Sequence, residues 1–249
     1  MGLRVGLVAA LWLLAAAPAR GDHCTAARVG GAAALERADA AVRLDFIRAR
    51  LRVEARRARV WSVAWAGTYA TLAVGQIAPT PFLAPADRNG LYIGSGAALI
   101  GLIPLAVTPL KSMADQRWLE RRLATAPPGT DVCALLAAAE GLFVRDAANE
   151  ARGRSWVFHV GNVAFNTALF FAVGAGLGHW TSAVISGVAG IGIGELMIFT
   201  QPIGAVGALR RYRAGDLGAA PAPASAPRLG VGPILAGPRG LGAALRVAF

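Results

Sequence analysis

The feature that most constrains the fold is a pattern that occurs twice, about ninety-five residues apart. Each copy begins with Glu-Ala-Arg, passes a tryptophan and two apolar stretches, and ends at Thr-Pro or Thr-Gln-Pro. The first copy runs from Glu54 to Pro109 and the second from Glu150 to Pro202. Each apolar stretch has about the length of a membrane-spanning helix, roughly 20 residues. The sequence therefore predicts an all-α membrane protein with four transmembrane helices, arranged as two duplicated hairpins.

The composition supports a membrane protein and argues against a nucleic-acid partner. Hydrophobic residues make up 55% of the chain and charged residues 16%, and the mean hydropathy is +0.51. Soluble domains contain about 25% charged residues. The net charge of +11 would suit a nucleic acid or an anionic lipid surface. Because the arginines are scattered beside the apolar stretches and are not interleaved with exposed aromatics, we expect a lipid bilayer and no nucleic acid as partner.

The amino terminus is typical of a secretory signal peptide over residues 1–20. Arg4 precedes an apolar run from Val5 to Ala17, and small residues at the end of that run suit a signal peptidase. We therefore expect a bacterial inner-membrane protein whose polar segments are exported to the periplasm. The positive-inside rule favours the opposite orientation, because six arginines between Arg48 and Arg59 directly precede the first predicted span.

Changes in polarity divide the rest of the chain into six parts. They are a polar, amphipathic helical segment over residues 21–59, a first transmembrane hairpin over 60–110, a polar helical segment over 111–154, a second transmembrane hairpin over 155–206, an Ala/Pro linker over 207–227 and a tail like a short β-hairpin over 228–249. Apolar residues alternate from Leu241 to Phe249, as in a strand. The tail is interpreted either as unstructured or as a peptide that adds to the sheet edge of a partner protein.

The two cysteines precede the two hairpins. Cys24 lies in the first polar segment and Cys133 in the second, and an oxidising compartment would allow them to form a disulfide. The alternative is two free, buried thiols that behave as small hydrophobic side chains. Neither cysteine has the partner spacing of a zinc site, so we expect no metal.

Polar residues inside the apolar stretches occur mainly in the second hairpin. His159, Asn162 and Asn166 recur at helical spacing, and Glu195 is the only carboxylate within a predicted span. Counted from the turn at Gly178, Asn162 and Glu195 lie equally far along their helices, so the two side chains are predicted to meet. An ionised carboxylate in hydrocarbon costs roughly 2.5 kcal/mol or more, so Glu195 must be protonated, hydrogen-bonded or hydrated.

This cluster has two interpretations. As a hydrogen-bonded contact it would fix how the second hairpin packs, whereas as a relay His159 and Glu195 would carry protons or a cation. Catalytic motifs are missing from the sequence, so we expect neither an enzyme nor a cofactor. The leading hypothesis is a noncatalytic envelope protein that organises or docks a partner, and the alternative is a small proton- or cation-conducting protein. The sequence predicts no oligomeric state.

The second half also resembles a known group of sequences. The resemblance rests on Glu150-Ala151-Arg152, Ser155-Trp156, His159-Val160-Gly161-Asn162, Asn166, Gly194-Glu195 and Phe199-Thr200-Gln201-Pro202. These residues resemble an uncharacterised group of small exported bacterial multipass membrane proteins. The resemblance implies a membrane location and no particular activity.

Overall fold

The computed structural model describes Cys24 and residues 29–31, 33–107, 109–218, 228–236 and 240–248. The predicted signal peptide and the part of the predicted linker after residue 218 lie outside these ranges. The elements are α1 (Ala33–Glu36), α2 (Ala40–Ile77), η1 (Thr80–Phe82), α3 (Pro85–Val107), α4 (Lys111–Ala124), α5 (Val132–Gly153), α6 (Trp156–Phe171), η2 (Ala172–Gly176), α7 (Trp180–Thr200), α8 (Gly204–Arg213), β1 (Arg228–Ala236) and β2 (Gly240–Ala248). The two strands pair antiparallel, from Arg228 opposite Ala248 to Ala236 opposite Gly240.

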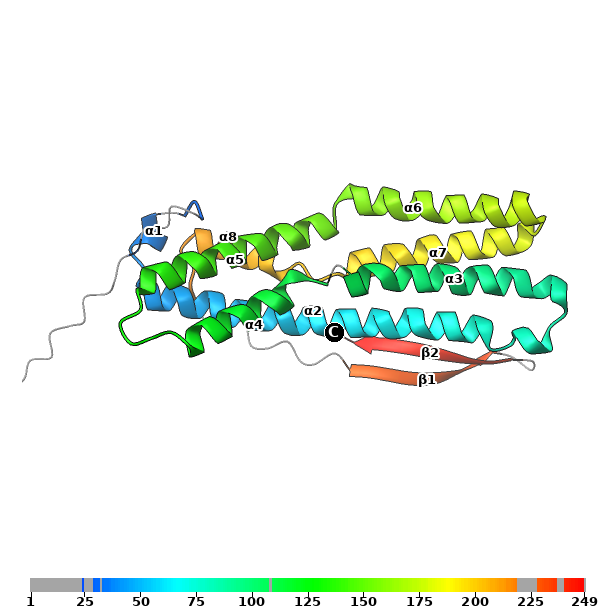
Figure 1. The fold of residues 1–249 in the computed structure, drawn as a ribbon, viewed down its shortest axis with the longest axis horizontal. Coiled ribbons are helices and arrows are strands. Elements are labelled where there is room, and N and C mark those ends of the chain that lie inside the picture. Colours follow the sequence, from blue (N-terminus) through cyan, green and yellow to red (C-terminus); the bar gives the residue numbers. More distant parts are fainter. Residues whose placement is uncertain are drawn as a thin grey trace, which may run out of the picture.

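The helices form two groups at opposite ends of an elongated molecule (Figure 1). One group, called the helical module below, consists of α1, α2 up to Arg59, α4, α5 and α8. The other group consists of the second half of α2 with α3, α6 and α7. Helix α2 belongs to both because its 38 residues continue without a break, which at 1.5 Å per residue is about 57 Å. This single helix therefore connects the polar and apolar ends of the protein.

Three helical stretches of the described chain are long and apolar enough to cross a membrane. They are Arg88–Ala124, Val132–Gly176 and Trp180–Arg213, and they contain α3, α6 and α7. The first predicted span, Val60 to Ala78, is not among them. Its tryptophans, tyrosine and glutamine lower its hydropathy below that of the other three. The structure is thus compatible with an integral membrane protein, and a fourth span stays a prediction.

Two boundaries differ from the sequence prediction. The polar residues from Pro85 to Gly90 favour a turn between the two apolar stretches of the first hairpin, but α3 already begins at Pro85, because proline fits the first position of a helix. Helix α8 occupies the first part of the linker predicted for residues 207–227. Its Leu209 and Tyr212 are buried against the module, so that packing keeps this segment helical. The sequence reasoning missed α8 because the Ala/Pro composition begins directly after it.

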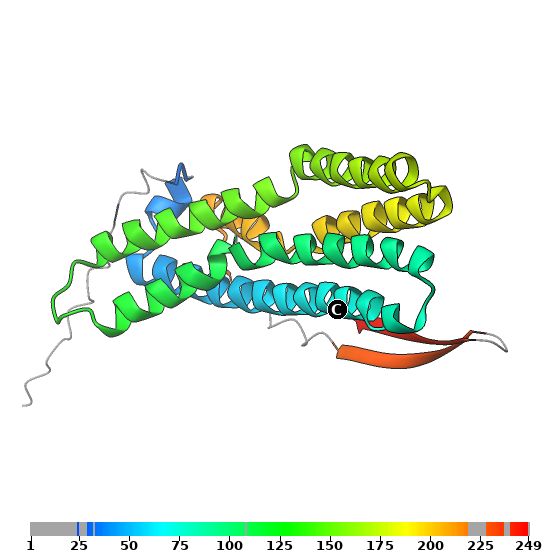
Figure 2. The same ribbon diagram turned by 45° about the vertical axis from the view of Figure 1, so that its right-hand side comes forward.

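The elements follow one another in the same order in both halves. Helices α2, α3 and α4 form the first series, and α5 with α6, α7 and α8 form the second (Figures 1 and 2). In each series the last helix packs on the helix that precedes the hairpin, α4 on α2 and α8 on α5. The series differ at one point, because α2 is continuous whereas α5 and α6 separate at Arg154 and Ser155. An origin of both halves by duplication stays a prediction.

The main hydrophobic core lies in the helical module. Phe46 of α2 packs against Phe143 of α5 and Tyr212 of α8, with ring centroids 6.5 and 5.6 Å apart. Aliphatic residues from these helices, from α4 and from the amino-terminal segment with α1 complete this core, among them Leu35, Ile47, Leu51, Leu119 and Leu136. The module is therefore packed like a small helical domain, and the amino-terminal segment, α2, α4, α5 and α8 all contribute to it.

Candidate functional site

The four polar residues predicted from the sequence meet between α6 and α7. Asn162 Nδ2 donates hydrogen bonds to Glu195 Oε1 and to the carbonyl oxygen of Ile191, both at 3.0 Å. His159 Nδ1 lies 2.5 Å from Glu195 Oε2. Asn166 Nδ2 donates to the backbone and side-chain oxygens of Asn162, both at 2.9 Å. These contacts, called the polar cluster below, form one continuous hydrogen-bonded chain.

The side chains of the polar cluster differ in their exposure to solvent. Asn166 is buried, whereas the side chains of His159 and Glu195 are 28% and 24% exposed. The imidazole ring also lies against Phe199, with centroids 5.1 Å apart. Both oxygens of Glu195 accept or share a hydrogen bond from α6, so the carboxylate is held by two partners. A charged imidazole would make this contact a salt bridge, and a neutral one a hydrogen bond.

Glycines of α7 make room for these side chains. A Cβ atom at Gly194 would overlap the amide of Asn162, and one at Gly190 would overlap the amide of Asn166. At Gly187 it would lie 3.3 Å from the Cβ of Phe170. Such small residues let two helices approach closely where lipid supplies no hydrophobic driving force. The glycine stripe therefore serves the contact between α6 and α7 within one chain.

Contacts at the base of the hairpins join the two halves. The indole Nε1 atoms of Trp61 and Trp65 donate to Thr200 Oγ1 at 3.2 and 3.0 Å. The backbone nitrogen of Lys111 donates to Asn149 at 3.4 Å. Within the second half, the side chain of Gln201 lies against Gly153. The sequence reasoning noted Trp61 and Thr200 only as markers of the two copies. Nothing in the sequence indicated that Trp61 of the first copy contacts Thr200 of the second.

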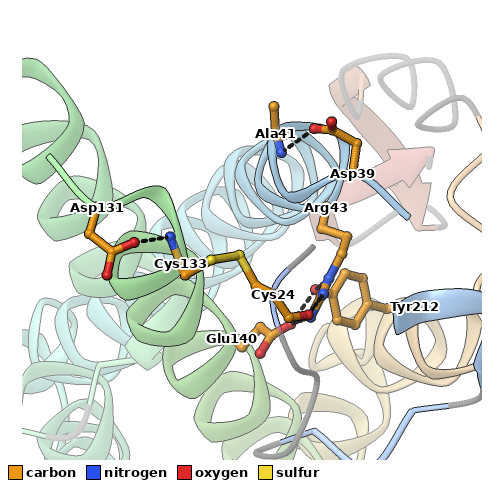
Figure 3. The surroundings of a disulfide bond; sticks show 8 residues. All are labelled: Cys24, Asp39, Ala41, Arg43, Asp131, Cys133, Glu140 and Tyr212. Carbon is orange, nitrogen blue, oxygen red and sulfur yellow. Dashed lines mark hydrogen bonds and ion pairs between the residues drawn. A yellow bond between two sulfur atoms is a disulfide. The ribbon is translucent and has the colours of Figure 1, made fainter. Parts of the chain in front are cut away.

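A disulfide bond joins Cys24 to Cys133, with the two Cα atoms 5.4 Å apart (Figure 3). Next to it, the fully buried Arg43 forms an ion pair with Glu140, also buried. Arg43 also donates to the carbonyl oxygen of Cys24 at 2.6 Å and to the Tyr212 hydroxyl at 3.1 Å. The Tyr212 hydroxyl in turn donates to Glu140 at 2.5 Å. One arginine thus connects the amino-terminal segment, α2, α5 and α8.

Buried carboxylates lie where the module meets the apolar helices. Glu150 Oε2 accepts a hydrogen bond from the backbone nitrogen of Ala205, in the first turn of α8, at 2.8 Å. Burial and the nearby Glu54 raise the pKa of Glu150 to about 8. Burial also raises the pKa of Glu54, against the opposing effect of Arg57. Burial and a neighbouring carboxyl group raise the pKa of Asp146 to about 9. These groups were not predicted as a cluster, because Glu54 lies on α2, far in sequence from Asp146 and Glu150 of α5.

No metal site was expected, and the described part of the chain holds no group of three or more histidine, cysteine or acidic side chains that fits a metal ion. Comparison with protein-family models, with curated proteins and with solved structures gave no match to this chain. Function must therefore be inferred from the arrangement of the chain's own residues.

Proposed function

We propose that this chain is a noncatalytic integral membrane protein of a bacterial cell envelope, and that it holds a rigid module at the membrane surface to dock a partner protein. The observation that carries the proposal is the buried network around Arg43. A fully buried arginine with partners on three other segments fixes their relative positions. The neighbouring disulfide closes a loop of 109 residues. A module fixed in this way is better suited to present a constant docking surface than to act as a moving part.

The polar cluster supports a structural role in the same proposal. Each of its side chains has a partner on the facing helix or one turn away, and three glycines of α7 are placed to receive α6. Interhelical hydrogen bonds of this kind stabilise membrane helix pairs by about 0.6 kcal/mol each. The cluster would then fix the second hairpin and, through Thr200, its position on the first hairpin.

The membrane location is tested by extraction and by reporter fusions. Carbonate washing should leave the protein in the membrane fraction. We propose four spans, with the module exported and the two hairpin turns in the cytoplasm. Fusions of an export-dependent reporter after residue 218 should be active, and fusions at Gly178 should be inactive. Active fusions at Gly178 with inactive ones after residue 218 would contradict the proposed orientation.

Docking is tested with photo-crosslinkers placed on the full chain in its native membrane. We propose that the partner binds the exposed surface of the module or adds a strand to the tail. Crosslinkers at exposed positions of the module, such as Glu36 and Arg122, are compared with one at the hairpin turn, His179. A product of constant mass from the module alone supports docking, and deletion of residues 228–249 shows whether the tail contributes. Equal products from all positions would speak against a docking surface.

Proton or cation conduction is the second candidate. The observation that favours it is the 2.5 Å contact of His159 with Glu195, in which both side chains keep about a quarter of their surface exposed. A relay requires a titratable pair with access to a proton donor. Flux into liposomes should then depend on Glu195, and Glu195→Gln should abolish it without unfolding the protein. Equal flux from wild type, Glu195→Gln and empty liposomes would exclude this role.

A further inference from the structure

Three helix ends and the middle of α2 lie at one level of the molecule, where the module meets the apolar helices. The contact of Trp61 with Thr200 places the start of the apolar part of α2 beside the end of α7. The contact of Gly153 with Gln201 brings the end of α5 to the same place. The start of α4 joins them, because Lys111 contacts Asn149, one turn before Gly153. The helices thus enter their apolar parts together, as they must at one face of a bilayer.

Exposed cations gather at this level. Arg59 lies two residues before Trp61, and Arg56 lies one turn earlier on α2. Lys111 begins α4, and Arg152 directly precedes Gly153. All four side chains are exposed, and none of them forms an ion pair within the described part of the chain. They come from three helices and form what we call the cationic collar: Arg56, Arg59, Lys111 and Arg152.

The nearest carboxylates cannot neutralise the cationic collar. Glu54 and Glu150 lie two residues before Arg56 and Arg152, but their side chains are only 2% and 3% exposed. Glu54 pairs with Arg57, which we leave out of the collar for that reason, and Glu150 binds the first turn of α8. Burial also raises the pKa of both carboxyl groups, which favours their neutral forms. These two carboxylates therefore leave the positive charge of the collar uncompensated.

Large apolar side chains border the cationic collar on its membrane side. Trp156 is 72% exposed and Phe199 is 62% exposed. Tryptophan prefers the level of the lipid headgroups, and arginines next to it reach the phosphates. We propose that the cationic collar binds the phosphates of anionic phospholipids, so that the protein selects such lipids around its helices.

The cationic collar also explains why the signal peptide and the positive-inside rule predict opposite orientations. Its side of the membrane carries the disulfide, and disulfides persist in oxidising compartments. The positive-inside rule would instead keep these cations in the cytoplasm. If the arginines and Lys111 bind lipid phosphates of the leaflet on the disulfide side, their positive charge serves lipid binding once the chain has been inserted. It then need not indicate the orientation of the chain.

The test measures lipid selectivity of the full chain in bilayers. Wild-type protein is reconstituted into phosphatidylcholine vesicles with a trace of spin-labelled phosphatidylglycerol or phosphatidylcholine. We expect the labelled anionic lipid to be preferred about fivefold over labelled phosphatidylcholine, in which the choline cation balances the phosphate. A fivefold preference is the effect of one net negative charge near one cation. The variant Arg56→Gln, Arg59→Gln, Lys111→Gln, Arg152→Gln should reduce this preference to less than about twofold. An unchanged preference in this variant would overturn the inference.

A control variant with the same change in charge distinguishes lipid binding at the cationic collar from an effect of the protein's net charge. Arg37, Arg121, Arg122 and Arg210 are exposed on the module away from the junction, and their replacement by glutamine should leave the preference intact. An equal loss in this control would also overturn the inference. So would stabilisation by inorganic phosphate in detergent with no lipid preference, because the collar would then be a free-phosphate site. If the quadruple variant does not fold, Arg59→Gln and Arg152→Gln are measured singly, and each must lower the preference.

The inference rests on the proposed membrane location but not on docking. Flotation of the vesicles with the protein is scored first. Protein that does not float contradicts both the membrane location and the cationic collar. Protein that floats without lipid preference contradicts the collar alone.

Discussion

Glu54 and Glu150 hold the same place in the two copies of the Glu-Ala-Arg motif, and their carboxyl groups meet at the first turn of α8. Glu150 accepts the backbone hydrogen of Ala205. A Cβ atom at the preceding Gly204 would overlap the carboxyl group of Glu54. Two acidic side chains thus face one helix start from α2 and α5, where the positive end of the α8 dipole attracts them. Because they also repel each other, at least one of them is expected to bind a proton.

This arrangement predicts that the module becomes less stable as the pH rises. Glu150 has a pKa of about 8 in the folded protein and 4.5 as its ordinary value. Between these values the folded state holds a proton that the unfolded state has lost. The stabilisation is therefore complete below pH 4.5 and is lost progressively up to pH 8, by on the order of 5 kcal/mol at most. Thermal unfolding in detergent from pH 5 to pH 9 measures this decrease.

The variant Glu150→Gln should flatten the pH dependence, because glutamine still accepts from Ala205 and does not titrate. Part of the slope should remain, since Asp146 has a pKa of about 9 in the folded protein and acts in the same direction. Glu36→Gln, at an exposed position of α1, is the matched control and should leave the slope unchanged. The same slope in wild type and Glu150→Gln would contradict the interpretation.

Whether a contact could be predicted from the sequence depends on whether one hairpin supplies it or several distant segments do. The spacing of His159, Asn162 and Asn166 and their distance from the turn predicted a cluster with Glu195, since a hairpin fixes which depths coincide. The network of Arg43, Glu140 and Tyr212 was missed, because three segments far apart in sequence contribute to it. Helix α8 was missed because the Ala/Pro composition directly after it indicated a linker, whereas its packing against α5, far away in sequence, stabilises it.

Removing one partner of the buried ion pair should destabilise the module strongly. Arg43→Met leaves Glu140 buried without its cation, which costs about 3 to 5 kcal/mol. The double variant Arg43→Met, Glu140→Met should recover much of this loss, because neither charge then remains. Chemical unfolding in detergent measures both. Tyr212→Phe, which removes one hydroxyl and keeps the ring, should cost only about 1 kcal/mol. A double variant less stable than Arg43→Met would contradict the pairing.

The glycines of α7 provide a matched pair of substitutions on one helix. Gly194→Ala forces the Asn162 amide to move, so we expect a loss of about 1 to 3 kcal/mol and a weaker contact of α6 with α7. Gly192→Ala adds the same methyl group where no atom lies within 4 Å, and it should be neutral. Disulfide crosslinking between cysteines introduced on α6 and α7 reports the contact, and thermal unfolding reports the stability. Equal effects of the two variants would show that the glycines do not set the helix approach.

The disulfide is expected to stabilise the module mainly by restricting its unfolded state. Cys24 and Cys133 are 109 residues apart, and loops of that length correspond to about 4 to 5 kcal/mol in the chain-entropy model. Cys133→Ser should lower the free energy of unfolding by about 2 to 5 kcal/mol, the typical cost of removing a native disulfide. Cys24→Ser and the double variant should cost about the same as Cys133→Ser, because each removes one and the same bond. Mass spectrometry after alkylation checks that wild type has no free thiol. Additive losses in the double variant would mean that each cysteine stabilises the module by packing, because a single shared bond can be lost only once.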